Sequence, residues 1–530
     1  MARQTRYIVL ILVLLSIGAL AVFAVPNSKA SENLAMITMF EPDESVFIPV
    51  VQRMVKPQPN LVYTIGRFVA YGFYSYGFPL FAPTALIYKA LTLLGQGENY
   101  PLLMLCARQI ISVMPMLASL WVLVYLQDQF KSWRSIVLFI FLLSIPAVVQ
   151  NGFWWHPDGL VMFFSSLVLY FLWKDKLAFG KNFYYAAVFC GILIALKVVG
   201  FFFFLTIASL LVWGLIDKKI TLKQFFLKGF LFIIIMTVAV VFSNPHLLIP
   251  AHRVWAFNVL KREILETSKG YGTVYDKGLS SALPVLTKFY GEAVFLLFAV
   301  GVSIRSLWDK QTRLLRVLIL TWFLPLSLHL LFFSHFKYQY WLPVAVPLFS
   351  NLAFLVPDKK IDFRNKSVLL QNVLLLIIAA QFVFFIKRDF QLFTARVHRL
   401  ENNPAVSFYE KTLTELEPVT QDLKIYYDYR LYLPETSGWK AETSFDLLDY
   451  DTIQSNAFDV LMLEQQRILD YIREDAVGID PLNFPKAQQF YRDANQGVLA
   501  DYVLLMRNEH ALLFIRQDLC PLYYDQQRCQ

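Results

Sequence analysis

The sequence contains little charge and lacks the short motifs of several large enzyme classes. Only 16% of the 530 residues are Asp, Glu, Lys or Arg, against about 25% in soluble domains, which excludes an ordinary soluble enzyme. Neither a GxxxxGK[ST] phosphate loop nor a GxGxxG motif occurs, so the chain has no visible means of nucleotide hydrolysis. HExxH and paired CxxC motifs are also missing, which leaves no signal for a structural zinc site. No internal repeat is evident, whereas inverted repeats are common in transporters.

Apolar and aromatic residues dominate the composition instead. Hydrophobic residues make up 57% of the chain and aromatic residues 16%, with a mean hydropathy of +0.50. Such values are typical of integral membrane proteins with many rings at the bilayer interface. The net charge of +9 would suit nucleic acid, but the basic residues lie mostly in short loops between apolar runs. We therefore expect a lipid bilayer and no nucleic acid as partner.

The apolar runs predict a polytopic α-helical membrane protein. A hydrocarbon core about 30 Å thick needs about 20 apolar residues per helix, and on this basis we count about 11 transmembrane helices. The expected spans are residues 7–25, 109–126, 135–149, 158–173, 183–196, 199–216, 229–243, 289–304, 317–333, 339–356 and 367–386.

Basic residues set the orientation of these spans. They are concentrated in the N-terminus, which has Arg3 and Arg6, and in short loops at 131–134, 174–181, 218–228, 305–316 and 359–366. The loop at 150–157, on the opposite side, has none. The positive-inside rule therefore places the N-terminus inside and, for an odd number of spans, the C-terminus outside. The first run exceeds the 7–15 residues of a signal-peptide core, so we expect an uncleaved anchor.

The composition divides the chain into two domains. Residues 1–386 form the membrane module, whose first extracytoplasmic loop covers about 26–108 and has an aromatic stretch at 71–95 that we expect to lie in the interface as helices. Residues 387–530 predict a soluble extracytoplasmic α/β domain, with strands near 423–433 and 458–463, a hairpin at 502–517 and a helix at 464–475. The spacing of Cys520 and Cys529 permits a disulfide in an oxidising compartment, and the residues alone leave open whether it forms.

Acidic and basic side chains gather at the predicted outer face of the membrane. Ionisable groups in or near spans are costly unless they serve a site, so this gathering predicts one. Some of these residues follow the first span, where Glu41 also lies. Others lie at the start of the fourth span or at the outer ends of later spans. They are Asp43, Glu44, His156, Asp158, Lys197, His335 and Lys337.

The order of these motifs resembles a known family. An Asp-Glu pair comes first, then Arg108 in "CARQIIS", "HPD" at the fourth span, a Lys between spans five and six, "NP" after span seven and "HFKYQYWLP" near span ten. Over about residues 1–390 this pattern is similar to the GT-C glycosyltransferases, particularly protein O-mannosyltransferases and lipid A aminoarabinose transferases. One departure is Lys337, where members often have Arg, which would retain the charge and lose the bidentate fork.

The resemblance implies an inverting glycosyltransferase that uses a sugar on a polyprenyl phosphate, which explains the missing nucleotide-binding motifs. It makes Asp43 the general base, with Glu44, His156 and Asp158 as further catalytic candidates. Glu44, His156 and Asp158 could instead cap helices. The candidates for binding the donor phosphate and sugar are Lys197, Arg108, Lys337, His335, Lys89, Arg253, Trp154 and Trp155. The two tryptophans could equally be interfacial anchors, and Lys197 could snorkel to the interface.

Several points stay open at this stage. A divalent cation, Mg²⁺ or Mn²⁺, could bridge Asp43 and Asp158, because carboxylates and phosphate suit hard cations. The acceptor could be a protein hydroxyl, a lipid head group or a growing surface glycan. A transporter or flippase for a polar lipid is the alternative function, and a non-catalytic scaffold is a third. We expect a bacterial inner membrane as the location.

Overall fold

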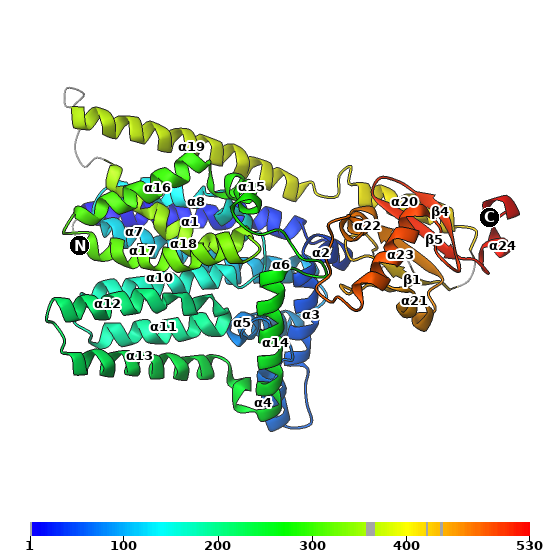
Figure 1. Cartoon of the computed structure of the whole chain (residues 1–530), viewed down its shortest axis with the longest axis horizontal. Helices are drawn as coiled ribbons and strands as arrows, with labels where there is room; N and C mark the ends of the chain where they lie inside the picture. The colour runs from blue at the N-terminus through cyan, green and yellow to red at the C-terminus, as the bar shows by residue number, and fades with distance from the viewer. Residues whose placement is uncertain (1–2, 357–365, 420–421, 435–437, 530) are drawn as a thin grey trace. The chain divides into compact units, whose positions relative to one another are not determined.

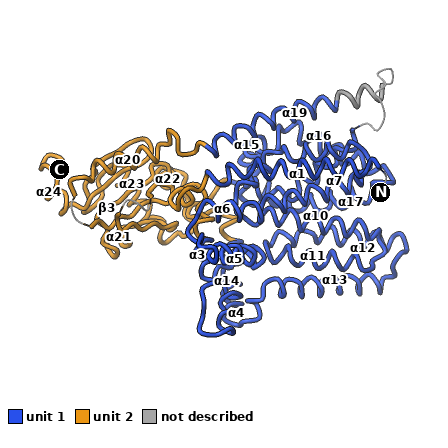
Figure 2. Tube along the Cα trace, turned by 180° about the vertical axis from the view of Figure 1, so that it is seen from behind, with its two compact units in different colours: residues 1–29, 47–264, 277–397 blue, residues 30–46, 265–276, 398–530 orange. Residues whose placement is uncertain are grey.

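The computed structural model describes residues 3–356, 366–419, 422–434 and 438–529, without the side chains of 366–373. Part of the last predicted inside loop, residues 357–365, thus lies outside the described residues. The chain forms two compact units, coloured separately in Figure 2. Unit 1 consists of Met1–Lys29, Phe47–Ile264 and Lys277–Val397. Unit 2 consists of Ala30–Val46, Leu265–Asp276 and His398–Gln530.

Unit 1 is built of helices, and every predicted span overlaps at least one of them. The helices on the predicted spans are α1 (Arg3–Lys29), α7 (Met114–Asp128), α8 (Arg134–Leu143), α10 (Asp158–Asp175), α11 (Lys181–Leu196), α12 (Phe204–Ile216), α13 (Leu222–Ser243), α16 (Ala293–Arg305), α17 (Arg313–Leu328), α18 (Tyr338–Ser350) and α19 (Lys366–Val397). Helices α10, α11 and α13 pack side by side in sequence order (Figure 1).

Judged by length and composition, fewer helices can cross the membrane than the sequence predicted. Among the described residues, five helical stretches are long and apolar enough to cross a bilayer. The number rises to seven if α8 with α9 (Pro146–Asn151), bent by 65°, and α15 (Leu279–Tyr290) with α16, bent by 81°, each form one span. The predicted number of about 11 is thus not confirmed, because several predicted spans are helices of fewer than 18 residues, such as α11. The chain is nonetheless a multi-pass membrane protein.

Further helices occupy the long segments between spans. They are α2 (Leu34–Phe40), α3 (Pro42–Val55), α4 (Leu61–Val69), α5 (Phe78–Leu93), α6 (Tyr100–Arg108) and α14 (Pro250–Lys269). The aromatic stretch at 71–95 is helical over α5, while residues 70–77 before it are irregular. Its placement in the membrane interface stays a prediction.

The sheet of unit 2 has five strands. The strands are β1 (Lys424–Tyr427), β2 (Lys440–Glu442), β3 (Val460–Glu464), β4 (Tyr502–Arg507) and β5 (Ala511–Arg516), in the order β2-β1-β3-β5-β4. β1 is parallel to β2 and β3, and β5 is antiparallel to β3 and β4. The predicted strand at 458–463, the hairpin and the helix at 464–475, which is α22 (Gln465–Ile472), are confirmed. The strand predicted at 423–433 is confirmed only over β1, because the backbone leaves strand conformation after Tyr427.

Side chains alternate between the two faces of this sheet and form two cores. Val460 and Met462 of β3 pack with α20 (Pro404–Leu416), while Leu461 and Leu463 pack with α22 and α23 (Phe484–Gln496). This is the period of two that a strand buried on both faces requires. The structure contains the disulfide Cys520–Cys529, with a Cα–Cα distance of 5.7 Å.

Unit 2 also includes two segments from the first part of the chain. Residues 30–46 contain α2 and the first turn of α3, and residues 265–276 pair with the domain through a bridge between Thr273 and Gly478. The sequence placed the domain boundary between residues 386 and 387. That position lies inside α19, and the two units divide after Val397.

Candidate active site

The predicted "HPD" motif and Lys197 form a buried ion pair network in unit 1. Asp158 begins α10 and is 1% exposed. Its Oδ1 accepts a hydrogen bond from Lys197 Nζ at 2.8 Å, and its Oδ2 lies 2.5 Å from His156 Nδ1. Lys197 follows the last residue of α11 in extended backbone, at φ −159° and ψ 135°. The break in the helix thus brings this cation to the start of α10.

Tyr76 extends the network at the other side of the imidazole. Its Oη lies 2.8 Å from His156 Nε2. An ionised carboxylate can only accept, so the proton of the imidazole lies on Nδ1, facing Asp158. In the neutral imidazole Nε2 then accepts from the Tyr76 hydroxyl. The arrangement fixes the tautomer and the orientation of the ring, as the partner of a functional histidine commonly does.

Local backbone packing explains how Tyr76 reaches this position. Gly77 approaches the end of α11 so closely that a Cβ there would lie 1.9 Å from the carbonyl oxygen of Ala195. Asn244, of the "NP" motif, joins the same two segments: its Oδ1 accepts from the Phe78 backbone N–H at 2.9 Å, and its Nδ2 donates to the Ala195 carbonyl at 3.0 Å. The "NP" motif therefore holds the segment with Tyr76 against the end of the helix that precedes Lys197.

Two ammonium groups lie around one aromatic ring near this network. Lys197 Nζ is 4.3 Å from the ring centroid of Tyr340 on α18, and Lys337 Nζ is 5.8 Å from it. A cation within about 6 Å of a ring face is attracted by the ring quadrupole. Tyr340 therefore brings the two predicted phosphate-binding lysines to one place. Sequence analysis did not select Tyr76 or Tyr340, because a tyrosine in so aromatic a chain carries no signal of its own.

Two other candidates lie close to the network. Trp154 stacks on His156, with centroids 4.1 Å apart and ring planes 15° apart. Trp155 is fully buried and packs edge-on against Phe47 at 5.3 Å. Sugar stacking by either tryptophan stays a prediction.

The remaining basic candidates are dispersed. Arg108 is fully buried and its Nη1 donates to the Asn27 carbonyl at 2.9 Å. His335 is partly buried just before α18. Lys89 is partly buried on α5 and Arg253 is exposed on α14, and within the described part of the chain neither side chain forms a hydrogen bond or ion pair.

A second cluster of polar rings lies between residues 71–76 and 246–255. Tyr74 Oη is 2.7 Å from His252 Nδ1, and the Tyr74 ring stacks on His246 at 4.3 Å. Burial, with His252 nearby, lowers the pKa of His246 to about 4. His246 is therefore neutral at physiological pH and packs as an aromatic ring.

The two carboxylates after the first span belong to unit 2. Asp43 and Glu44 lie in the first turn of α3, where the helix dipole favours negative charge. Glu44 is fully buried and Asp43 partly buried. Asp158, the other predicted catalytic carboxylate, belongs to unit 1.

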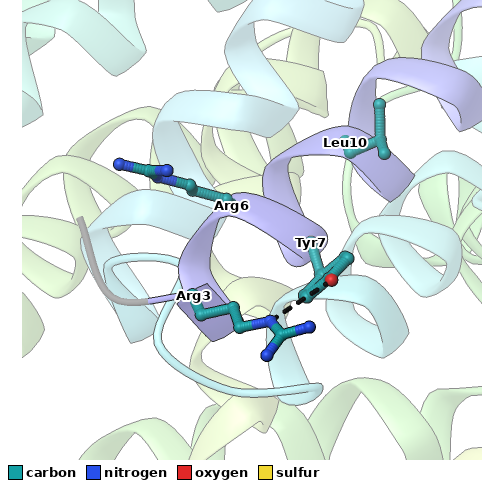
Figure 3. Close-up of a pocket in the computed structure, with 4 residues that line it drawn as sticks. All are labelled: Arg3, Arg6, Tyr7 and Leu10. Carbon is teal, nitrogen blue, oxygen red and sulfur yellow. Dashed lines mark hydrogen bonds between the residues drawn. The ribbon is translucent and has the colours of Figure 1, made fainter.

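Two further features bear on ligand sites. Within the described ranges, no group of three or more His, Cys, Asp or Glu residues could hold a metal ion. A hollow at the N-terminal end of α1 is lined by Arg3, Arg6, Tyr7 and Leu10 (Figure 3). It lies at the predicted inside end of the span, so it is not part of the candidate active site.

Comparison with known proteins gives the fold. No protein-family model and no curated protein sequence matches the chain. A solved structure of ArnT from Cupriavidus metallidurans bound to undecaprenyl phosphate matches with a TM-score of 0.53 and 12% identity, over 96% of this chain and 97% of that chain. The apo state of the same ArnT matches with a TM-score of 0.50 and 13% identity, over 95% and 97%. The chain has the GT-C fold. Because ArnT is a GT-C lipid A aminoarabinose transferase, the predicted resemblance is confirmed at the level of the fold.

Proposed function

We propose that the chain is an inverting glycosyltransferase that moves a sugar from a polyprenyl phosphate to an acceptor hydroxyl at the outer face of a bacterial inner membrane. The observation that carries the proposal is the buried Lys197–Asp158–His156 network at one end of α10 and α11, on a GT-C fold. A buried carboxylate between a lysine and a histidine is costly unless it serves a site. ArnT, which shares the fold, is solved with undecaprenyl phosphate bound.

The lysines supply the positive charge that the leaving group needs. Lys197 and Lys337 face the same ring of Tyr340, so together they suit a polyprenyl phosphate whose chain stays in the bilayer. Such preorganised charge is strong in a water-excluded site because the local dielectric is low. The Asp158 carboxylate holds Lys197, and His156 with Tyr76 holds Asp158, so these three are positioning residues.

Asp43 is the general base of the transfer. Its carboxylate takes the proton of the acceptor hydroxyl as the acceptor oxygen bonds to the anomeric carbon, and the bond from that carbon to the phosphate oxygen breaks. One displacement with one base inverts the anomeric configuration. General-base assistance of this kind contributes about 10²–10⁴-fold in rate. Polyprenyl phosphate leaves as the anion, without an acid to protonate it.

Transfer by the purified protein in detergent tests this proposal. Labelled polyprenyl-phosphate sugars would be offered with envelope lipid, peptide and glycan acceptors, and the labelled product identifies the acceptor class. We expect Asp43→Asn to bind the donor by thermal shift and to transfer at least about 100-fold more slowly than wild type. EDTA treatment, followed by Mg²⁺ or Mn²⁺, tests the predicted divalent cation in the same assay.

Asp451→Asn is the matched control, because the side chain of Asp451 is 73% exposed in unit 2. It makes the same chemical change away from the proposed base and is expected to transfer like wild type. If Asp43→Asn transfers as fast as this control, Asp43 is not the base. If no donor in the panel binds, the glycosyltransferase proposal itself is wrong and a lipid transporter becomes the better interpretation.

A further inference from the structure

Glu41, the first carboxylate after the opening helix, forms a buried ion pair with Arg399 within unit 2. Arg399 Nη1 donates to Glu41 Oε2 and Nη2 donates to Oε1, both at 2.7 Å. The two side chains are 9% and 8% exposed. This is the bidentate geometry in which a guanidinium fixes both the position and the plane of a carboxylate.

Two further contacts hold the guanidinium in place. Arg399 Nη1 also donates to the Ala30 carbonyl at 3.1 Å, and its Cζ lies 4.0 Å from the centroid of the Phe40 ring. Phe40 is the last residue of α2 and directly precedes Glu41. Arg399 therefore contacts the segment from Ala30 to Glu41 at three points, whereas an ordinary surface ion pair has a single contact.

Glu41 in turn sets the start of α3, the helix that carries Asp43. It is the residue between α2 and α3. Its backbone N–H donates to the Ile37 carbonyl at 2.8 Å, and its carbonyl accepts from the Glu44 N–H at 2.9 Å and the Ser45 N–H at 3.4 Å. These bonds close the first turn of α3 around Asp43. A shift of Glu41 therefore moves Asp43.

The other side of the ion pair is anchored to the sheet of unit 2. Asn403 Nδ2 donates to the Arg399 carbonyl at 2.9 Å, and its Oδ1 caps α20 by accepting from the Ala405 N–H. Phe408 of α20 is fully buried in the core against the sheet. A second tie comes from Asn33, the N-cap of α2, whose Nδ2 donates to Tyr432 Oη at 3.1 Å.

We propose that Arg399 is a positioning residue for Asp43, so that the C-terminal α/β domain takes part in sugar transfer by orienting the general base. The inference rests on the proposed function, because it takes Asp43 as the base. Arg399 acts through Glu41 and the first turn of α3 and does not touch the substrate. A misplacement of about 1 Å at a reacting group can lower the rate by about 100-fold, so the effect belongs in kcat.

Two variants test the proposal in the purified full-length protein. Arg399→Lys retains the charge and loses the fork, and the pair Glu41→Gln with Arg399→Gln removes both charges together, so that no buried charge is left unpaired. We expect kcat to fall about 10- to 100-fold in both, with the donor KM within about 2-fold of wild type. The control is Asp451→Asn with Lys486→Gln, which removes an exposed ion pair of 2.8 Å in the same unit and leaves kcat unchanged.

The background of Asp43→Asn separates positioning from a general loss of structure. If Arg399 acts through Asp43, Arg399→Lys lowers the residual rate of Asp43→Asn by less than about 2-fold. An equal fall in both backgrounds shows a merely structural role and overturns the proposal. It is also overturned if both Arg399 variants transfer like wild type while Asp43→Asn is slow. If Asp43→Asn itself transfers normally, the assignment of the base is what fails. The melting temperature of each variant is measured beside its rate, and Arg399→Lys decides the matter if the double variant does not fold.

Discussion

Replacing Lys197 with methionine tests whether the buried network is an ion pair on which both folding and transfer depend. Methionine retains the length of the side chain and removes the ammonium that lies 2.8 Å from Asp158. Removing one partner of a buried pair typically costs about 3–5 kcal/mol, because the other charge stays buried and uncompensated. Lys197 is 17% exposed and His156 still contacts the carboxylate, so we expect a loss of about 2–3 kcal/mol.

Two companion variants separate stability from chemistry. Lys197→Arg keeps a positive charge beside Asp158 and should retain most of the stability. Asp158→Asn combined with Lys197→Met removes both charges, so the melting temperature should recover most of the loss, which we estimate at about 3–6 °C for Lys197→Met alone. Sugar transfer should not recover in the double variant, because the positive charge proposed to face the donor phosphate is still missing.

The assay measures the melting temperature in detergent and the rate of labelled sugar transfer on the same preparations. Two results would refute the reasoning. The first is a Lys197→Met protein as stable as wild type, which would mean that Asp158 is not held as a buried anion by this lysine. The second is a double variant that transfers sugar at the wild-type rate, which would mean that Lys197 has no role beyond folding.

Two further predictions concern unit 2. Burial raises the pKa of the Glu464 carboxyl to about 7. Between about pH 4.5 and 7 the folded protein therefore keeps a proton that the unfolded chain loses. The free energy of unfolding falls as pH rises through this window, by about 3 kcal/mol in all. Glu464→Gln should abolish this fall in melting temperature between pH 5 and pH 8, and a variant that keeps the wild-type slope would contradict the assignment. The double variant Cys520→Ser with Cys529→Ser removes the disulfide and leaves no free thiol. It should lower the free energy of unfolding by about 3 kcal/mol, as expected for so short a loop. An unchanged melting temperature in non-reducing buffer would show that the bridge does not constrain the unfolded chain.

The helices of unit 1 could be predicted because long apolar runs leave few alternatives in a bilayer. The ends of these helices could not be predicted, because a helix continues as long as its residues can adopt helical backbone angles, whether or not lipid surrounds them. Helix α19 shows this: the apolar run ends near residue 386, but Lys387, Arg388 and the following residues keep the helix to Val397. The break between α8 and α9 is also invisible in hydropathy, because apolar residues flank it. The break at Lys197 was predicted, because a charged residue there separates the spans 183–196 and 199–216.

The candidate site could be predicted only where the residue type was unusual for its surroundings. Lys197, His156 and Asp158 are ionisable groups next to apolar runs, and the structure brings these three together. Arg399 lies among many other charged residues in a polar domain, and its partner is 358 residues away in the chain. Nothing in local sequence can report a pair at that separation.

The environments of Asp158 and Asp43 support the different roles that we propose for them, although the sequence offered both as catalytic. A general base must direct a lone pair at the proton that it removes. In Asp158 each carboxylate oxygen already faces a strong donor, Lys197 Nζ at 2.8 Å and His156 Nδ1 at 2.5 Å, so protonating it would break the network that holds the lysine. Asp43 is partly exposed at the start of a helix, and within the described ranges its carboxylate has neither a hydrogen bond nor an ion pair. Of these two carboxylates, Asp158 is therefore suited to orient a cation, and Asp43 is suited to the proposed role of accepting a proton.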